Sequence, residues 1–145
     1  MWVLIQEGVN DRAYCDQGWI HAGLLRMLEL RGIGGVCRGG VSTTTVFDCI
    51  ERGNVCIASV TVDFRGGRKN PNGQRIPRGG HLVVVNGAKR VDGVSYLRCH
   101  HPSSSVVMNL ANEWVPEQQF RKSFSGNIVE VHWGELFYRT GKRRR

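Results

Sequence analysis

The stretch RGGHLVVVNGA, residues 78–88, decides how this chain folds, because it combines a buried strand with a histidine at its start. The run from Leu82 to Val85 is apolar without interruption, which is typical of a strand covered on both faces. His81 begins that run, and the double glycine before it allows the backbone to approach other segments closely. Two interpretations of His81 follow: a catalytic base at the mouth of a cleft, or the polar first residue of a core strand.

Apolar patterns on either side of this strand predict the remaining elements. The expected helices, each with a capping signal, a first-turn proline or a helical apolar spacing, span residues 18–31, 42–53 and 115–124. The expected strands are short runs rich in apolar residues, and they lie at residues 1–10, 54–64, 81–88, 94–101 and 127–133. We therefore expect an α+β fold in which N-terminal helices pack on a small antiparallel sheet.

The length of 145 residues suits one domain with a sizeable core. We expect this domain over residues 1–138, followed by a basic, disordered tail over residues 139–145. No apolar run approaches the roughly 20 residues of a membrane span, and the first residues lack the basic region and cleavage site of a signal peptide. The five cysteines are odd in number and contain no CxxC pair, which favours a cytoplasmic protein with reduced thiols.

The net charge of +8 is concentrated in two segments. Residues 65–78 and residues 139–145 each carry five basic side chains and no acidic one, whereas the rest of the chain holds 10 basic and 12 acidic residues. Because the loop at 65–78 directly precedes His81, it should border the same region, either as a recognition site for an acidic peptide or as a solvated loop. The tail leaves nucleic-acid binding open as a weaker alternative, although no nucleic-acid motif occurs.

A cysteine and two histidines stand where a thiol-based site would need them. Cys15 immediately precedes the first long predicted helix, where the positive end of the helix dipole favours a thiolate. His81 opens one strand, and Cys99, His100 and His101 end the next, so adjacent strands would place His81 beside residue 100 or 101. A histidine near a thiol removes its proton and later protonates the leaving amine, and a further polar group orients that histidine. The pattern therefore indicates a site for nucleophilic catalysis.

The segments GGHLVVVNGA and GVSYLRCHHPSSS resemble the catalytic half of the double-glycine leader peptidases and their stand-alone bacterial relatives, and the resemblance extends over roughly residues 18–132. These are cysteine peptidases of the papain-like fold. The resemblance implies a cysteine peptidase or amide hydrolase acting on a peptide or protein substrate, with His81 as the base. Arg78, Gly79 and Gly80 directly precede this base, and we expect them to line the substrate cleft. His101 falls where the family has aspartate or asparagine, so an imidazole replaces the usual orienting group.

The nucleophile region departs from the family pattern. In CDQGWIHAGLL, Cys15 lacks the following glycine, and Gln6, the candidate oxyanion-hole residue, lies nine positions upstream. Residues 18–32 are more similar to the family's second or third helix than to its first. Three possibilities stay open: Cys15 is the nucleophile, a second chain completes the active site, or the chain is a catalytically inactive relative that binds a leader or substrate peptide or a partner protein.

The Cys-His-His sequence at residues 99–101 also has the residue types of a metal site. Neighbouring strand residues point to opposite faces, so His100 and His101 are badly placed to bind one ion together, and no zinc-site spacing occurs. We expect no metal and no cofactor. Cys49 and Cys56 lie within apolar patterns and are expected in the core.

Overall fold

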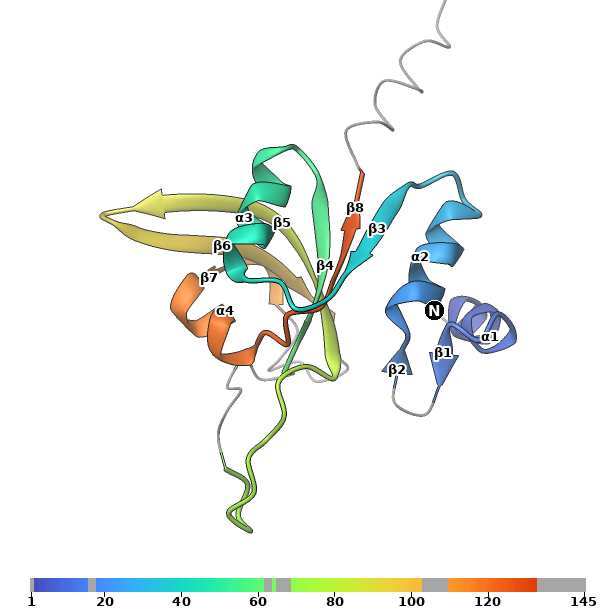
Figure 1. Cartoon of the computed structure of the whole chain (residues 1–145), viewed down its shortest axis with the longest axis horizontal. Coiled ribbons are helices and arrows are strands. Elements are labelled where there is room, and N and C mark those ends of the chain that lie inside the picture. Colours follow the sequence, from blue (N-terminus) through green and yellow to red (C-terminus); the bar gives the residue numbers. More distant parts are fainter. Residues whose placement is uncertain (1, 16–17, 62–63, 65–68, 103–109, 133–145) are drawn as a thin grey trace, which may run out of the picture.

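The computed structural model describes residues 2–15, 18–61, 64, 69–102 and 110–132. In this part of the chain, four α-helices and a six-stranded antiparallel sheet form an α+β structure, and two short strands form a separate hairpin (Figure 1). The helices are α1 (Trp2–Asn10), α2 (His21–Glu29), α3 (Thr43–Glu51) and α4 (Glu117–Ser123). The strands are β1 (Tyr14–Cys15), β2 (Gly18–Trp19), β3 (Gly35–Arg38), β4 (Val55–Val60), β5 (His81–Val91), β6 (Val94–His101), β7 (Leu110–Pro116) and β8 (Ile128–Val131).

The six-stranded sheet has the order β3-β8-β4-β5-β6-β7, and every neighbouring pair is antiparallel. β4 pairs with β5 so that Val60 lies opposite His81. β5 and β6 form a hairpin whose two turn residues, Asp92 and Gly93, have positive φ angles of 49° and 78°. These angles match the type I′ turn, which preserves the twist of both strands and for which Asp-Gly is a preferred sequence. The turn thereby directs the end of β6 toward the start of β5.

One face of the sheet carries the hydrophobic core, and α3 and α4 cover it (Figure 1). The strands contribute fully buried side chains from alternate positions: Cys56, Ala58, Val60, Val83, Val85, Leu97, Cys99 and Ile128. α3 contributes Val46 and Cys49, and α4 contributes Phe120. Burial of apolar surface, at roughly 25 cal/mol per Å², is the main force that holds these helices on the sheet.

On the opposite face, α2 packs on β3 and β8. Close backbone approach makes glycine necessary at two positions there. A Cβ on Gly35 would lie 2.5 Å from the carbonyl oxygen of Glu130, and a Cβ on Gly23 would lie 2.4 Å from the Cα of Ala13. Figure 1 shows α1 and the β1–β2 hairpin next to α2, on the side of the molecule away from α4.

A buried carboxylate connects β8 to its neighbours. The residue Glu130 is 2% exposed; Arg38 Nε donates to one carboxylate oxygen at 3.0 Å, and Arg52 and Asn54 donate to the other at 2.9 Å and 3.0 Å. Burial raises the pKa of Glu130, but these hydrogen bonds outweigh burial and hold the pKa below its ordinary value. The carboxylate therefore stays ionised at neutral pH and ties β3 and the α3–β4 turn to β8.

The structure confirms the α+β class and most of the predicted elements. The N-terminal strand is wrong: residues 2–10 form helix α1, because a short apolar run does not by itself distinguish a strand from a helix. The helix predicted at 18–31 begins only at His21, since Gly18 and Trp19 pair with Cys15 and Tyr14. The helix predicted at 115–124 begins after Pro116, which ends β7 and caps α4.

The sequence patterns do not predict β3 and β7, the two edge strands of the sheet. The basic tail at 139–145 and the first four residues of the basic loop lie outside the described residues. Within the described part of the chain, no helix is long and apolar enough to cross a membrane.

Candidate active site

His81 is the first residue of β5 and lies half-buried at the end of the sheet. The two glycines before it, Gly79 and Gly80, have φ angles of 97° and 89°, a conformation that favours glycine. A Cβ on Gly79 would lie 3.0 Å from both the Cβ of Ser125 and the Oγ of Ser59, whereas a Cβ on Gly80 would meet nothing within 4 Å. The chain is thus held against β4 and the α4–β8 loop immediately before His81.

The structure brings His81 and His101 together. Their rings stack, with centroids 4.3 Å apart and planes inclined by 27°. In the β5–β6 pair, Val84 lies opposite His100, and because side chains alternate between faces, His81 and His101 lie on the same face of the sheet. His101 is fully buried at the end of β6, so His81 is the outer member of the pair.

Phenylalanine side chains enclose the buried side of the pair. The ring centroid of Phe64 lies 5.3 Å from that of His101 and 6.4 Å from that of Phe120, and Phe124 lies 5.2 Å from Phe120. All three phenylalanines are at most 5% exposed. These phenylalanines form an apolar wall between the sheet and α4, and the histidine pair packs against it. His81 is the half-buried member of the pair and the one nearer to solvent.

The surroundings of His81 favour its neutral form. Burial is the largest cause that lowers its pKa and His101 lowers it further, while a hydrogen bond with the Pro102 backbone acts in the opposite direction. Because proline has no N–H, this bond runs from a ring N–H of His81 to the Pro102 carbonyl. Nε2 of His81 is buried and has no hydrogen-bond partner among the described residues, so Nδ1 is the donor and Nε2 carries the lone pair. This tautomer can accept a proton at Nε2.

Cys15 belongs to another part of the fold. It is an exposed residue of β1 and lies opposite Gly18 of β2. Figure 1 shows this hairpin beside α1 and α2, and it forms a two-stranded sheet separate from the six-stranded sheet that contains β5. The expectation that Cys15 stands at a helix N-terminus is wrong, because β2 separates it from α2. The structure thus joins His81 and His101 but sets Cys15 on a different sheet, and its role as a nucleophile stays a prediction.

The other four cysteines are less accessible than Cys15. Cys49, Cys56 and Cys99 are fully buried, which confirms the core position expected for Cys49 and Cys56. Burial raises the pKa of Cys99 to about 12. Burial, with a smaller contribution from Glu29, also raises the pKa of the partly exposed Cys37. Cys15 is therefore the thiol most open to a reagent or a partner.

The remaining predicted residues lie as follows. Gln6 is exposed on α1, and its amide donates to Asn10 Oδ1 at 3.2 Å within the same helix. Arg78 is exposed in the loop before the two glycines. His100 faces away from His101, as expected for neighbouring strand residues. Among the residues the structure describes, no group of three or more His, Cys, Asp or Glu side chains is placed to hold a metal ion.

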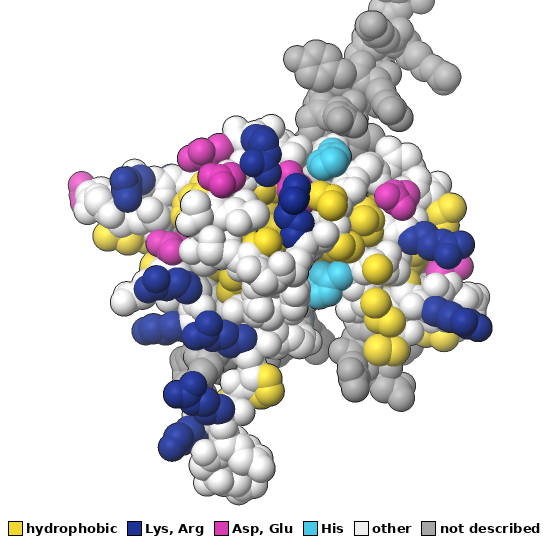
Figure 2. All heavy atoms as spheres, viewed as in Figure 1, with side chains coloured by type: hydrophobic (Ala, Val, Ile, Leu, Met, Phe, Trp, Pro, Cys, Tyr) yellow, Lys and Arg dark blue, Asp and Glu magenta, His cyan; other side chains and the backbone are white. Residues whose placement is uncertain are grey.

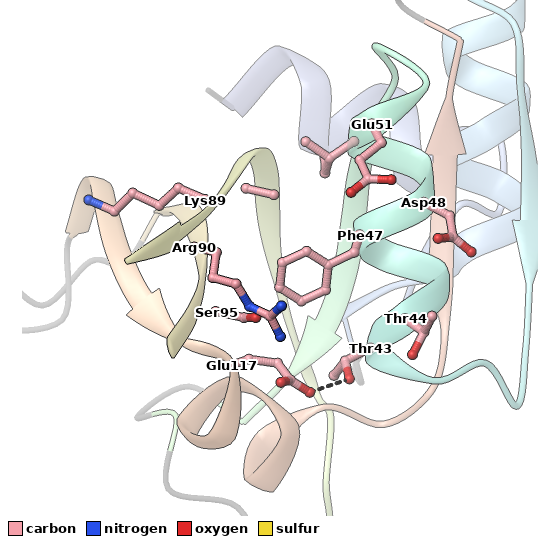
Figure 3. A pocket seen from close by; sticks show the side chains of 11 residues that line it. Thr43, Thr44, Phe47, Asp48, Glu51, Lys89, Arg90, Ser95 and Glu117 are labelled. Atoms are coloured by element: carbon pink, nitrogen blue, oxygen red, sulfur yellow. Dashed lines mark hydrogen bonds between the residues drawn. The ribbon is translucent and has the colours of Figure 1, made fainter. Parts of the chain in front are cut away.

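A separate open pocket of about 560 Å³ lies between α3, α4 and the β5–β6 hairpin (Figure 3). The side chains of Phe47 and Arg90 point toward each other in it, and Thr43 Oγ1 donates to Glu117 at 2.7 Å at one end. Sequence patterns do not reveal this pocket because its lining comes from three distant segments. It is lined by neither His81 nor its partner, so it is distinct from the candidate site.

Comparison of the chain with protein-family models, with curated proteins and with solved structures finds no match in any of the three. A function for this chain therefore has to be inferred from its own residues and their geometry.

Proposed function

We propose that this chain is a cysteine peptidase or amide hydrolase of the papain-like fold, in which His81 acts as the general base and acid. The observation that carries the proposal is the stacked pair of His81 and His101 at the end of the sheet, with ring centroids 4.3 Å apart. The resemblance of residues 79–88 and 93–105 to the double-glycine leader peptidases supports the same role. A peptide or protein is accordingly the proposed substrate, in a cleft bordered by Arg78, Gly79 and Gly80.

The chemistry requires a proton acceptor, and Nε2 of His81 is suited to it. A thiol gives its proton to Nε2, the thiolate attacks the carbonyl carbon of the scissile bond, and the imidazolium then protonates the leaving amine. Water hydrolyses the resulting thioester. A buried polar atom without a hydrogen bond costs about 1–3 kcal/mol. A thiol S–H donating to Nε2 would offset that cost. Because Nε2 is buried in this structure, the proposal requires the His81 ring to turn outward for the thiol to reach it.

His101 is the positioning residue in this proposal. It contacts His81 through the ring face from the core side, and Phe64 packs against His101 with ring centroids 5.3 Å apart. An imidazole lacks the negative charge with which aspartate stabilises an imidazolium. The lowered pKa of His81 fits this difference, because the site favours a neutral base over a charged ion pair.

The nucleophile is tested first by labelling. Because Cys15 is exposed, modification of its thiol does not by itself show that it is the nucleophile. The informative quantity is whether the rate of modification of Cys15 depends on His81. The rate of iodoacetamide addition at Cys15 near pH 6 is measured by peptide mass spectrometry in the parent, in His81→Ala and in the control His100→Ala. Activation by His81 predicts a fall of about tenfold or more in His81→Ala alone. Equal rates in all three proteins would remove Cys15 as the nucleophile of this chain.

Turnover is tested separately with a fluorogenic peptide that carries Gly-Gly before the scissile amide, the type of site the resemblance implies. Hydrolysis that is lost in His81→Ala and kept in His100→Ala supports the proposal. If the parent is inactive alone but active with a second chain that supplies a thiol, the nucleophile comes from that chain. Undiminished hydrolysis by His81→Ala would refute the role of this histidine.

A second candidate is a catalytically inactive relative that binds a leader or substrate peptide. The position of Cys15 on a different sheet from His81 favours it. In that case peptide binding survives both Cys15→Ser and His81→Ala, and the parent shows no turnover under any condition. Loss of binding in both variants, together with turnover by the parent, would exclude this candidate.

A further inference from the structure

Two groups of basic residues meet beside the candidate site. The sequence from 65 to 80 contains five basic side chains and no acidic one, and Arg121 and Lys122 lie in the last turn of α4. The acidic residue of α4, Glu117, lies in its first turn, where its carboxylate accepts a hydrogen bond from Thr43. The basic side chains of these two groups that lie among the described residues are all exposed, and we name them the basic track: Lys69, Arg75, Arg78, Arg121 and Lys122. Figure 2 shows Lys and Arg side chains gathered over α4 and over the loop that projects below it.

Backbone contacts hold the two segments together. The N–H of Thr61 donates to the carbonyl of Ser123 at 3.2 Å, and the N–H of Ser125 donates to the carbonyl of Ser59 at 3.0 Å. At the other end of the loop, Gly79 packs so closely on Ser125 that an added Cβ would lie 3.0 Å from the serine Cβ. The base of the loop is thus fixed to the end of α4, and the track leads through Gly79 to His81.

The charges of the track are available to a partner. The ion pairs found between described residues use the basic residues Arg31, Arg38 and Arg52, and none uses a member of the track. Exposed cations of one sign with no carboxylate between them attract an anionic partner. Unlike the Arg38 and Arg52 charges, which Glu130 neutralises, those of the track are not neutralised by a described carboxylate.

The aromatic side chains near the track favour an acidic peptide over a nucleic acid. Sites for single-stranded nucleic acid combine basic grooves with exposed aromatic rings on which bases stack. Among the described residues, the phenylalanines that precede the loop or belong to α4 and its C-cap, Phe64, Phe120 and Phe124, are all buried in the core. Carboxylate groups, by contrast, need only the Lys and Arg side chains that the track exposes.

We propose that the basic track binds an acidic segment, rich in Asp and Glu, of the peptide that enters the cleft at His81. The assignment of the cleft rests on the proposed function, whereas the anion-binding role of the track does not depend on turnover. In this proposal, the peptides that the chain acts on carry acidic residues on one side of the bond that is cleaved.

The test measures binding, so it does not require an active enzyme. A short fluorescein-labelled peptide of alternating glutamate and alanine is titrated with the whole protein, and fluorescence anisotropy is recorded. A peptide with glutamine in place of glutamate and a single-stranded DNA oligonucleotide of equal length are the comparison probes. Two double variants, each lowering the net charge from +8 to +6, are compared: Arg75→Gln with Lys122→Gln in the track, and Lys89→Gln with Arg90→Gln on the β5–β6 hairpin.

The proposal predicts that the glutamate peptide binds, that the glutamine peptide does not, and that the track variant weakens binding by about fivefold or more while the hairpin variant does not. Equal weakening in both double variants would mean that only net charge matters and would overturn the proposal. Tighter binding of the oligonucleotide than of the glutamate peptide would also overturn it. Failure of the labelling and turnover tests, with track binding retained, would reject the proposed enzyme and leave this inference standing.

Discussion

The two glycines before His81 allow a quantitative prediction, because they share a backbone conformation but differ in their surroundings. Gly79→Ala and Gly80→Ala both place a side chain at positive φ, 97° and 89°, which costs about 1–2 kcal/mol. The new Cβ of Gly79→Ala also lies 3.0 Å from Ser125 Cβ and from Ser59 Oγ. The serine hydroxyl can rotate, but Ser125 Cβ is fixed by the backbone hydrogen bond of that residue to Ser59, so overpacking adds about 1–2 kcal/mol.

We therefore expect Gly79→Ala to lower the free energy of unfolding by about 2–4 kcal/mol and Gly80→Ala by about 1–2 kcal/mol. For a chain of this length the corresponding falls in Tm are roughly 10 °C and roughly 5 °C. Urea unfolding followed by tryptophan fluorescence measures the free energy of unfolding of both variants. A double-mutant cycle with Ser125→Gly isolates the contact, because this change removes the Cβ that the new alanine meets.

The double variant Gly79→Ala with Ser125→Gly should recover the contact share of the loss and keep the share due to positive φ. Equal losses for Gly79→Ala and Gly80→Ala, with no coupling to Ser125, would refute the close packing of Gly79 on Ser125 next to His81.

Three further predictions concern burial and charge. Glu130→Gln should lower the free energy of unfolding by about 2–3 kcal/mol, because Arg38 and Arg52 lose the carboxylate to which they donate. The exposed control Glu113→Gln should cost less than about 0.5 kcal/mol. Urea unfolding measures both changes. The pKa of His81 is lowered by burial and by His101, so its contribution to stability is present above the unfolded value of 6.5 and is lost as pH falls through the folded value. His81→Asn should therefore make Tm fall less steeply from pH 7 to about pH 5 than in the parent, and an unchanged slope would contradict this assignment. Phe120→Ala should cost about 3–5 kcal/mol and Phe120→Leu clearly less, because the ring is fully buried against two other phenylalanines; a loss below 1 kcal/mol for the alanine variant would contradict this packing.

Local sequence signals predicted the part of the fold around His81 well. Continuous β-branched runs identify β4, β5 and β6, and the Asp-Gly turn of residues 92 and 93 connects two of them by a tight hairpin. In such a hairpin, the start of the first strand and the end of the second lie near each other, so His81 was expected beside residue 100 or 101. Which of the two histidines shares its face was decided by the β-bulge between Val85 and Gly87, because the bulge shifts the register by one residue.

The position of Cys15 could not be predicted in this way. Residues 14–15 and 18–19 pair with each other in a small hairpin. Gly8 admits the ring of Trp19, whose nearest atom would lie 2.7 Å from an added Cβ, and the N–H of Ile20 donates to the carbonyl of Ala13. These are contacts between α1, the hairpin and the start of α2, and no local pattern encodes them. The basic track likewise joins a loop to a helix end more than 40 residues later in the chain.

The sequence by itself determined the α+β class, the strand that carries His81, the hairpin that joins it to the strand of His101 and the segments where positive charge concentrates. Each of these follows from interactions between residues close in sequence or joined by one turn. Only the tertiary structure decided which face of the sheet is the core, that Glu130 is buried with three donors, that Gly79 is packed on Ser125, and that Cys15 lies on a separate sheet. The physical reason is that these features depend on how helices pack over the sheet, which is set by long-range burial and not by local propensity.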